Sequence, residues 1–127
     1  MSPSVPVSWG ELIDKVTILE IKSERLKAEA ALKNVRRELA ILRPFADEAL
    51  RNAEVAALKS ELKRINETLW KIEDDIRDKE AAKLFDEEFV RLARAVYFTN
   101  DERGRVKQKI NQALKSDITE EKHYSAY

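Results

Sequence analysis

Apolar residues in the middle of the chain recur with gaps that alternate between three and four positions. The series runs from Val55 to Ile76 and is interrupted by neither glycine nor proline. Such spacing is typical of a helix that packs lengthwise on other helices. Acid-first pairs at i,i+4 spacing, such as Glu67 with Lys71, add to the stability of this helix. We therefore expect a long helix over about residues 53–83. The apolar members of the series are Val55, Leu58, Leu62, Ile65, Leu69, Ile72 and Ile76.

The N-terminal third has two neighbouring apolar series on what reads as one helix, over about residues 8–43. Ser8 with Glu11 forms a capping box at its start, and Pro44 is expected to end it at about Arg43. A short turn of helix around residues 47–50 fits the loop that follows. Two adjacent series on one helix need two neighbours, or one neighbour and a partner chain. The first series is Leu12, Val16, Leu19 and Leu26, and the second is Ile18, Ile21, Ala28, Leu32, Val35, Leu39 and Leu42.

A third helix is expected over about residues 86–115. Asp86 is a good N-cap, and heptad spacing places Phe85, Phe89, Leu92, Val96, Val106, Ile110 and Ala113 on one face. The same face includes Thr99 and Arg103, which are polar, and Gly104 costs ~1 kcal/mol inside a helix. The helix is therefore either continuous with a polar middle or broken near Thr99, and we expect it to be continuous.

These patterns predict an all-α fold, with three long antiparallel helices packed as a coiled-coil-like bundle over a single domain of residues 1–127. We expect residues 1–7 and 116–127 to be flexible. Charged residues are 38% of the chain, which has two glycines and three prolines. This composition is typical of long, exposed helices.

Charge and composition also exclude several classes of function. The formal net charge is zero, so no nucleic-acid partner is expected. No stretch approaches the ~18 apolar residues of a membrane span, and the N-terminus lacks the features of a signal peptide, so we expect a cytoplasmic protein. The single histidine, His123, excludes a diiron centre built from two Glu-x-x-His motifs. We predict no cofactor and no metal.

Polar residues from the three expected helices lie at the same height along the bundle axis when the chain is folded at its two connections. A turn near residue 48 places residue 20 opposite about residue 76, and a turn near residue 85 places residue 73 opposite about residue 97. The candidate site residues at this level are Glu20, Trp70, Glu73, Arg77, Arg94, Tyr97, Asn100 and Asp101.

Two interpretations of this level remain open. The simpler is a buried network that sets helix register, in which one stranded charge costs ~3–5 kcal/mol. Under it, Arg94 is buried against Glu73 or Asp101. In the other interpretation the residues line a groove, where Arg77 and Arg94 hold an anion. Trp70 and Tyr97 then stack on that anion.

Two helical enzyme classes have partial matches. All-helical nucleotide pyrophosphohydrolases hold magnesium with pairs of acids, but Mg²⁺ needs several converging oxygens, and a chain with 24 acids shows such spacings by chance. The acids that could meet in this way are Glu11, Asp14, Glu80 and Asp86. The second expected helix looks superficially like the first helix of chorismate mutase. Glu73 and Asp74, however, stand where that enzyme has a pair of arginines.

Four segments resemble a family of small bacterial proteins that is described only as a domain of unknown function. The segments are SWGELIDKVTILEIKSERL, LKRINETLWKIEDDIRDKE, FDEEFVRLARAVYFTNDERGRVKQKIN and EEKHY. They cover most of the chain outside residues 28–55. The resemblance implies no established activity, but it implies an association with glycosyl transfer and surface polysaccharide. The residues it indicates are Glu11, Asp14, Glu20, Trp70, Glu73, Arg94, Tyr97, Asn100 and Asp101.

The function predicted from these observations is a protein–protein interaction or scaffold module. The resemblance implies that this module is accessory to cell-envelope glycan synthesis. We expect a dimer formed through the first helix, because its two apolar series exceed what one neighbour needs. The alternative is a small-molecule or nucleotide-sugar binding protein, or an enzyme, with an anion-binding groove. Exposure of the Trp70, Glu73, Arg94 and Tyr97 cluster to water distinguishes the two.

Overall fold

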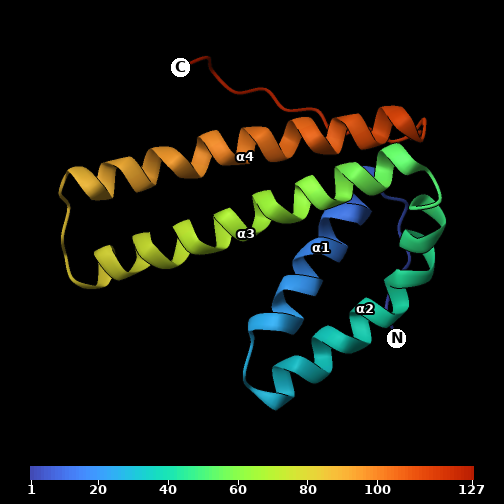
Figure 1. Cartoon of the computed structure of the whole chain (residues 1–127), viewed down its shortest axis with the longest axis horizontal. Helices are drawn as coiled ribbons and strands as arrows, with labels where there is room; N and C mark the ends of the chain where they lie inside the picture. The colour runs from blue at the N-terminus through green and yellow to red at the C-terminus, as the bar shows by residue number, and fades with distance from the viewer.

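The computed structural model describes the whole chain, residues 1–127, and contains four α-helices and no strand. The helices are α1 (Trp9–Arg25), α2 (Glu29–Ala49), α3 (Ala53–Ala81) and α4 (Glu87–Ala113). Figure 1 shows α3 and α4 as one long antiparallel hairpin, with the shorter α1/α2 hairpin projecting obliquely from one half of it. The all-α prediction is confirmed, but the number of helices is four and not three.

The second and third expected helices correspond closely to α3 and α4. Asn52 caps α3, and Asp86 caps α4 by accepting a hydrogen bond from the Phe89 N–H at 2.9 Å. Helix α4 is continuous through Thr99 and Gly104, as expected. Both helices are found where apolar periodicity and a local cap agree.

The expected helix over residues 8–43 is wrong, because the chain breaks at residues 26–28 and returns as α2. Leu26 and Ala28 have extended backbone (ψ 143° and 122°), and no glycine or proline marks the position. The break lets α2 fold back on α1, so that the two apolar series largely cover each other and Leu26 packs against the core. The series therefore find neighbours within the chain, and the reason for expecting a dimer through the first helix is removed.

Pro44 lies inside α2 and does not end it. A proline removes one N–H from a helix, but Pro44 and Ala40, whose carbonyl would have accepted that hydrogen bond, are both exposed. Beyond Pro44, Ala46 and Ala49 are buried in the core, and this packing continues the helix. Residues 47–49, expected to start a separate helical turn, are the last residues of α2.

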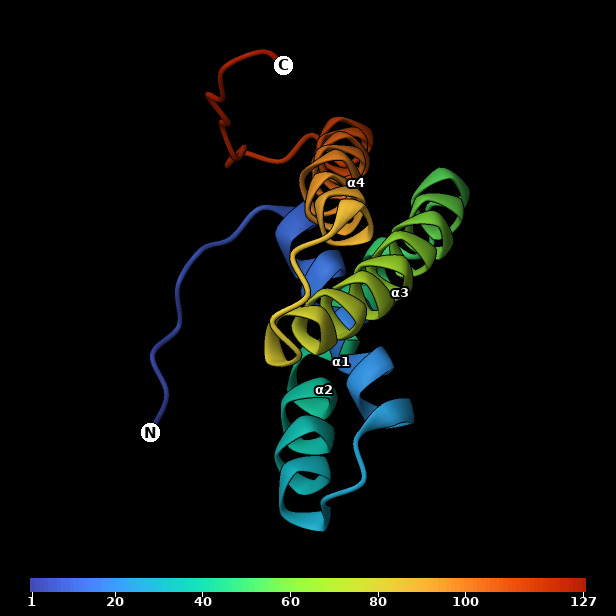
Figure 2. The same cartoon turned by 90° about the vertical axis from the view of Figure 1, so that its left-hand side faces the viewer.

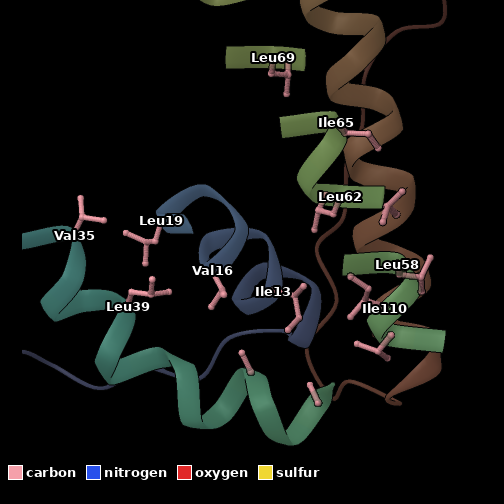
Figure 3. Packing of buried hydrophobic residues seen from close by; sticks show 14 residues of the cluster. Ile13, Val16, Leu19, Val35, Leu39, Leu58, Leu62, Ile65, Leu69 and Ile110 are labelled. Atoms are coloured by element: carbon pink, nitrogen blue, oxygen red, sulfur yellow. The ribbon is translucent and has the colours of Figure 1, made fainter. Parts of the chain in front are cut away.

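The core is one cluster of 14 buried apolar residues drawn from all four helices. Figure 3 shows Ile13, Val16 and Leu19 of α1 between the side chains of α2 and those of α3 and α4. At the start of α1 the backbone itself approaches α4. A Cβ atom at Gly10 would overlap the carbonyl oxygen of Lys107, so this close approach requires glycine.

The far half of the α3/α4 hairpin extends beyond the α1/α2 hairpin (Figure 1). Figure 2 views the long hairpin nearly end-on, with α2 below it. We call residues 70–100 the arm. After Leu69, α3 has no buried residue, and Leu92 is the only buried residue of α4 before Gly104. At the base of the arm, Arg25 of α1 lies over the Trp70 ring. Beyond its base, α3 and α4 pack on each other and not on α1 or α2 (Figure 1).

The C-terminal residues 116–127 run back beside α4 without regular secondary structure (Figure 1). Their last ring, Tyr127, packs on Tyr97 and Phe98, with ring centroids 5.1 and 4.8 Å apart. None of the four helices combines the length and apolar character that crossing a membrane would need.

Candidate functional site

A buried polar network joins α1, α3 and α4 at the base of the arm. Asp14 of α1 is 1% exposed, and both of its carboxylate oxygens accept hydrogen bonds from the Arg103 guanidinium of α4. From α3, the Asn66 amide donates to Asp14 Oδ1 and to Thr17 Oγ1, each at 2.9 Å. We call these four residues the central network. It links three helices through one carboxylate.

The arginine of the central network keeps its charge at all ordinary pH values. Hydrogen bonding to Asp14 raises the pKa of Arg103 above its usual value, although burial acts in the opposite direction. A bidentate arginine–carboxylate pair is among the strongest hydrogen-bonded contacts in proteins. Its first consequence is structural, since it sets the register of α1 against α4.

A second polar link joins α1, α4 and the C-terminal segment. Lys107 Nζ, which is almost fully buried, lies 2.8 Å from Glu11 Oε2 and 2.9 Å from Glu120 Oε2. Burial lowers the pKa of Lys107, but the hydrogen bonds that Lys107 donates to Glu11 and Glu120 outweigh this effect, and the net shift of the pKa is upward. The Gly10 N–H donates to Asn111 Oδ1 at 2.7 Å beside this pair.

The acids considered for magnesium do not converge. Asp14 and Glu11 pair with Arg103 and Lys107, and Asp86 pairs with Lys79 at the other end of the molecule at 2.9 Å. No three of the histidine, aspartate or glutamate side chains are grouped so that they could hold a metal ion.

Beside the central network, an open groove of about 410 Å³ lies between α1, α3 and α4. Trp70 is half-buried in its wall, and the Arg25 guanidinium carbon lies 5.9 Å from the Trp70 ring centroid. Arg77 on the rim pairs with Glu73 at 3.4 Å. The apolar lining is Ile18, Ile21, Leu69 and Trp70, and the polar lining is Asn66, Glu73, Asp74, Arg77, Asn100 and Arg103.

A second hollow, of about 570 Å³, lies between α4 and the C-terminal segment. We call it the tyrosine pocket, because three of its lining residues are tyrosines. Arg103 and Asn100 line both this pocket and the groove. The lining residues are Tyr97, Asn100, Asp101, Arg103, Lys122, Tyr124, Ser125 and Tyr127.

The family of the chain follows from its match to a family model. The model of DUF6165, a family of unknown function, matches residues 3–127. The chain belongs to DUF6165. The match includes all four helices, the groove and the tyrosine pocket, and it confirms the resemblance to a family of unknown function. No curated protein and no solved structure matches the chain. The DUF6165 description names no activity, so the association with glycosyl transfer stays a prediction.

The eight candidate residues of this DUF6165 chain do not form one cluster. The groove brings together Trp70, Glu73, Arg77 and Asn100. The tyrosine pocket contains Tyr97, Asp101 and again Asn100. Glu20 and Arg94 line neither hollow. The groove is open to water, so the residues within it are not a sealed network.

Glu20 and Arg94 depart furthest from expectation. Glu20 Oε2 lies 3.1 Å from Lys59 Nζ, far along α3 from the expected level near residue 76, because the first turn is at residues 26–28 and not near residue 48. Arg94 was expected to be buried beside Glu73 or Asp101. It is exposed instead, with its guanidinium carbon 5.7 Å from the Phe98 ring centroid and no carboxylate partner.

The residue that sequence reasoning missed is Arg103. The pattern of α4 places it on the apolar face, where it looks like a defect. Asp14 of α1 and Asn66 of α3 are likewise polar residues beside apolar series, and the structure brings all three together. Polar interruptions on three helices are the signal that could have identified this centre, since buried charges must be paired.

Proposed function

We propose that this DUF6165 chain is an interaction module, and that its arm binds a second copy of the chain. The observation that supports this proposal is the uncovered apolar surface of the arm. The central network holds the base of the arm in place, and α1 and α2 cover only the other half of the α3/α4 hairpin (Figure 1).

Apolar side chains concentrate at the tip of the arm. Leu84, Phe85 and Val90 are 51%, 58% and 53% exposed. Phe85 also packs edge-on against Phe89, at 5.2 Å between ring centroids. Clustered exposed apolar residues on a folded protein commonly mark an interaction surface. Along the rest of the arm, Ile72 is only half-buried, because a two-helix hairpin cannot close over its own seam.

A second copy is the occupant that fits this surface most simply. Two antiparallel helix pairs that pack face to face form a four-helix bundle, which buries the seams of both pairs. A twofold dimer uses the same patch from each copy, and the formal net charge of zero means that two copies do not repel each other at long range. The predicted dimer is thus retained, with the arm in place of the first helix.

Sedimentation equilibrium over a range of concentrations tests this proposal. We expect the wild type to be a dimer at tens of micromolar and the double variant Leu84→Glu/Val90→Glu to be a monomer. Both side chains are more than half exposed, so the fold itself should be unaffected.

The matched control is Ile41→Glu/Phe45→Glu on α2. These residues are 62% and 56% exposed, and the change in charge is the same. We expect this variant to remain a dimer. A wild type that stays monomeric at hundreds of micromolar, or a control that dissociates as readily as the arm variant, would show that the arm is not the interface.

A further inference from the structure

The tyrosine pocket contains a lysine without a carboxylate in direct contact. Lys122 forms no ion pair, and its side chain lies across Gly104 of α4. A Cβ atom at Gly104 would be 3.2 Å from Lys122 Nζ and 3.5 and 3.6 Å from its Cε and Cδ. Glycine is unfavourable inside a helix compared with alanine. A methyl group at this position would press on the lysine amine, which would have to move by a few tenths of an ångström.

Arg103 provides the second cation of the pocket in a fixed orientation. Three of its five N–H groups donate to Asp14 and Asn100, which leaves two for a ligand. Because both oxygens of the buried Asp14 hold the guanidinium, its plane is set before any ligand arrives. A planar, oriented guanidinium matches the oxygens of a phosphate group.

The remaining walls of the pocket suit a ring and hydroxyl groups. Tyr97 and Tyr127 present aromatic faces at 5.1 Å between centroids, and Tyr124 is 72% exposed beside them. Such faces stack on flat rings, above all on nucleobases. Asp101 lines the pocket and forms no ion pair with any of its cations, so its oxygens are available to accept hydrogen bonds from hydroxyl groups.

We infer that the tyrosine pocket binds a nucleoside monophosphate. The phosphate lies between Lys122 and Arg103, the base stacks on the tyrosines and the ribose hydroxyls donate to Asp101. The pocket shares Tyr97 and Asn100 with the base of the arm but none of the exposed apolar residues at its tip, so neither proposal depends on the other.

Isothermal titration calorimetry with four probes tests the ligand class. The probes are adenosine monophosphate, adenosine, inorganic phosphate and glucose 1-phosphate. We expect adenosine monophosphate to bind more tightly than each of the others, since it alone engages both the cations and the rings. Equal affinity for inorganic phosphate and adenosine monophosphate would overturn the part assigned to the tyrosines, and tighter binding of glucose 1-phosphate would replace the nucleotide by a sugar phosphate.

Two lysine variants locate the phosphate. Lys122→Met keeps the length of the side chain and removes its charge. It should lower the affinity for adenosine monophosphate about tenfold, as expected for the loss of one charged hydrogen bond. Lys109→Met makes the same change at an exposed lysine of α4 that lies outside the pocket. It should leave the affinity unchanged.

Gly104→Ala separates ligand binding from folding. Alanine favours the helix, so the melting temperature should not fall. The new methyl group would crowd the Lys122 amine at 3.2 Å, so we expect it to shift the amine and to weaken the binding of adenosine monophosphate. Absence of adenosine monophosphate binding at millimolar concentration, or equal binding by the wild type, Lys122→Met and Gly104→Ala, would overturn the inference.

Discussion

Two arginines of α4 show how differently one residue type can act within one helix. Arg103 is the partner of Asp14, whose side chain is 2% exposed. Arg94 is exposed to water and has only the Phe98 ring beside it. The contrast arises from the position of α1, whose Asp14 pairs with Arg103, whereas no carboxylate pairs with Arg94.

The same substitution at both arginines should therefore give different losses of stability. Arg103→Met strands the buried Asp14 carboxylate and should lower the free energy of unfolding by ~3–5 kcal/mol. Arg94→Met keeps the aliphatic stem and removes an exposed contact with an aromatic ring, which should cost ~0–1 kcal/mol. Urea denaturation followed by circular dichroism measures both. Equal losses would mean that the Asp14–Arg103 pair is not the buried contact described above.

The sequence predicts which part of the bundle is polar more reliably than it predicts the contacts that the polar residues form there. Trp70, Glu73 and Asn100 do share one groove, because the turn between α3 and α4 is where it was expected. Glu20 was placed wrongly, because its level depended on a turn that lies elsewhere. The prediction that Arg94 and not Arg103 is buried was wrong for a different reason. Arg103 lies on the apolar face of α4, where a charged residue is unfavourable unless a partner from another helix reaches it.

At the scale of helices, local signals determined some boundaries and tertiary packing determined others. Ser8 and Asp86 accept the hydrogen bonds expected of N-caps, from Glu11 and Phe89. The break at residues 26–28 has no such signal. The chain breaks there because two short helices that fold on each other bury both apolar series. The free energy gained by this burial depends on tertiary contacts, which the local sequence pattern does not show. Pro44 shows the converse, since a strong local stop signal is overridden by buried residues beyond it.

Replacing Pro44 should show how much stability the proline costs in α2. Pro44→Ala restores the N–H and removes the ring, so the free energy of unfolding should rise, by at most the ~3 kcal/mol that separates proline from alanine in a helix interior. Thermal and urea denaturation measure the change. Arg43→Ala, at the exposed neighbouring position, is the control and should change stability little. A less stable Pro44→Ala would indicate that the proline shapes α2 in a way that its packing requires.

At the scale of the whole molecule, the chain consists of two hairpins of unequal length joined by a polar centre. The short hairpin covers one half of the long one, and the C-terminal segment lies along α4 (Figure 1). The arm and the tyrosine pocket are on parts of the α3/α4 hairpin that the short hairpin leaves uncovered. The fold thus leaves two surfaces uncovered by the short hairpin, with the central network at the point where they meet.

Attachment of the C-terminal segment should depend on pH through Glu120. Its hydrogen bond from Lys107 holds the pKa of Glu120 below the ordinary value of 4.5, although burial acts against this. A carboxyl group whose pKa is lowered by folding stabilises the folded state above its unfolded pKa, and loses that contribution as the pH falls through the lowered value. The segment should therefore loosen below about pH 4.5. Because Glu120 is 42% exposed, the contribution is at most ~1 kcal/mol.

Nuclear magnetic resonance can follow this release through the contacts of the Tyr127 ring with Phe98. We expect their cross-peaks to weaken as the pH falls below 4.5, and to be weak already at neutral pH in Glu120→Gln, which cannot form the ion pair. Glu121→Gln is the matched control, since Glu121 forms no ion pair with Lys107, and it should behave as the wild type does. If the Tyr127 contacts persist at neutral pH in Glu120→Gln, the aromatic cluster alone holds the segment. The Lys107–Glu120 pair then has no part in closing the tyrosine pocket.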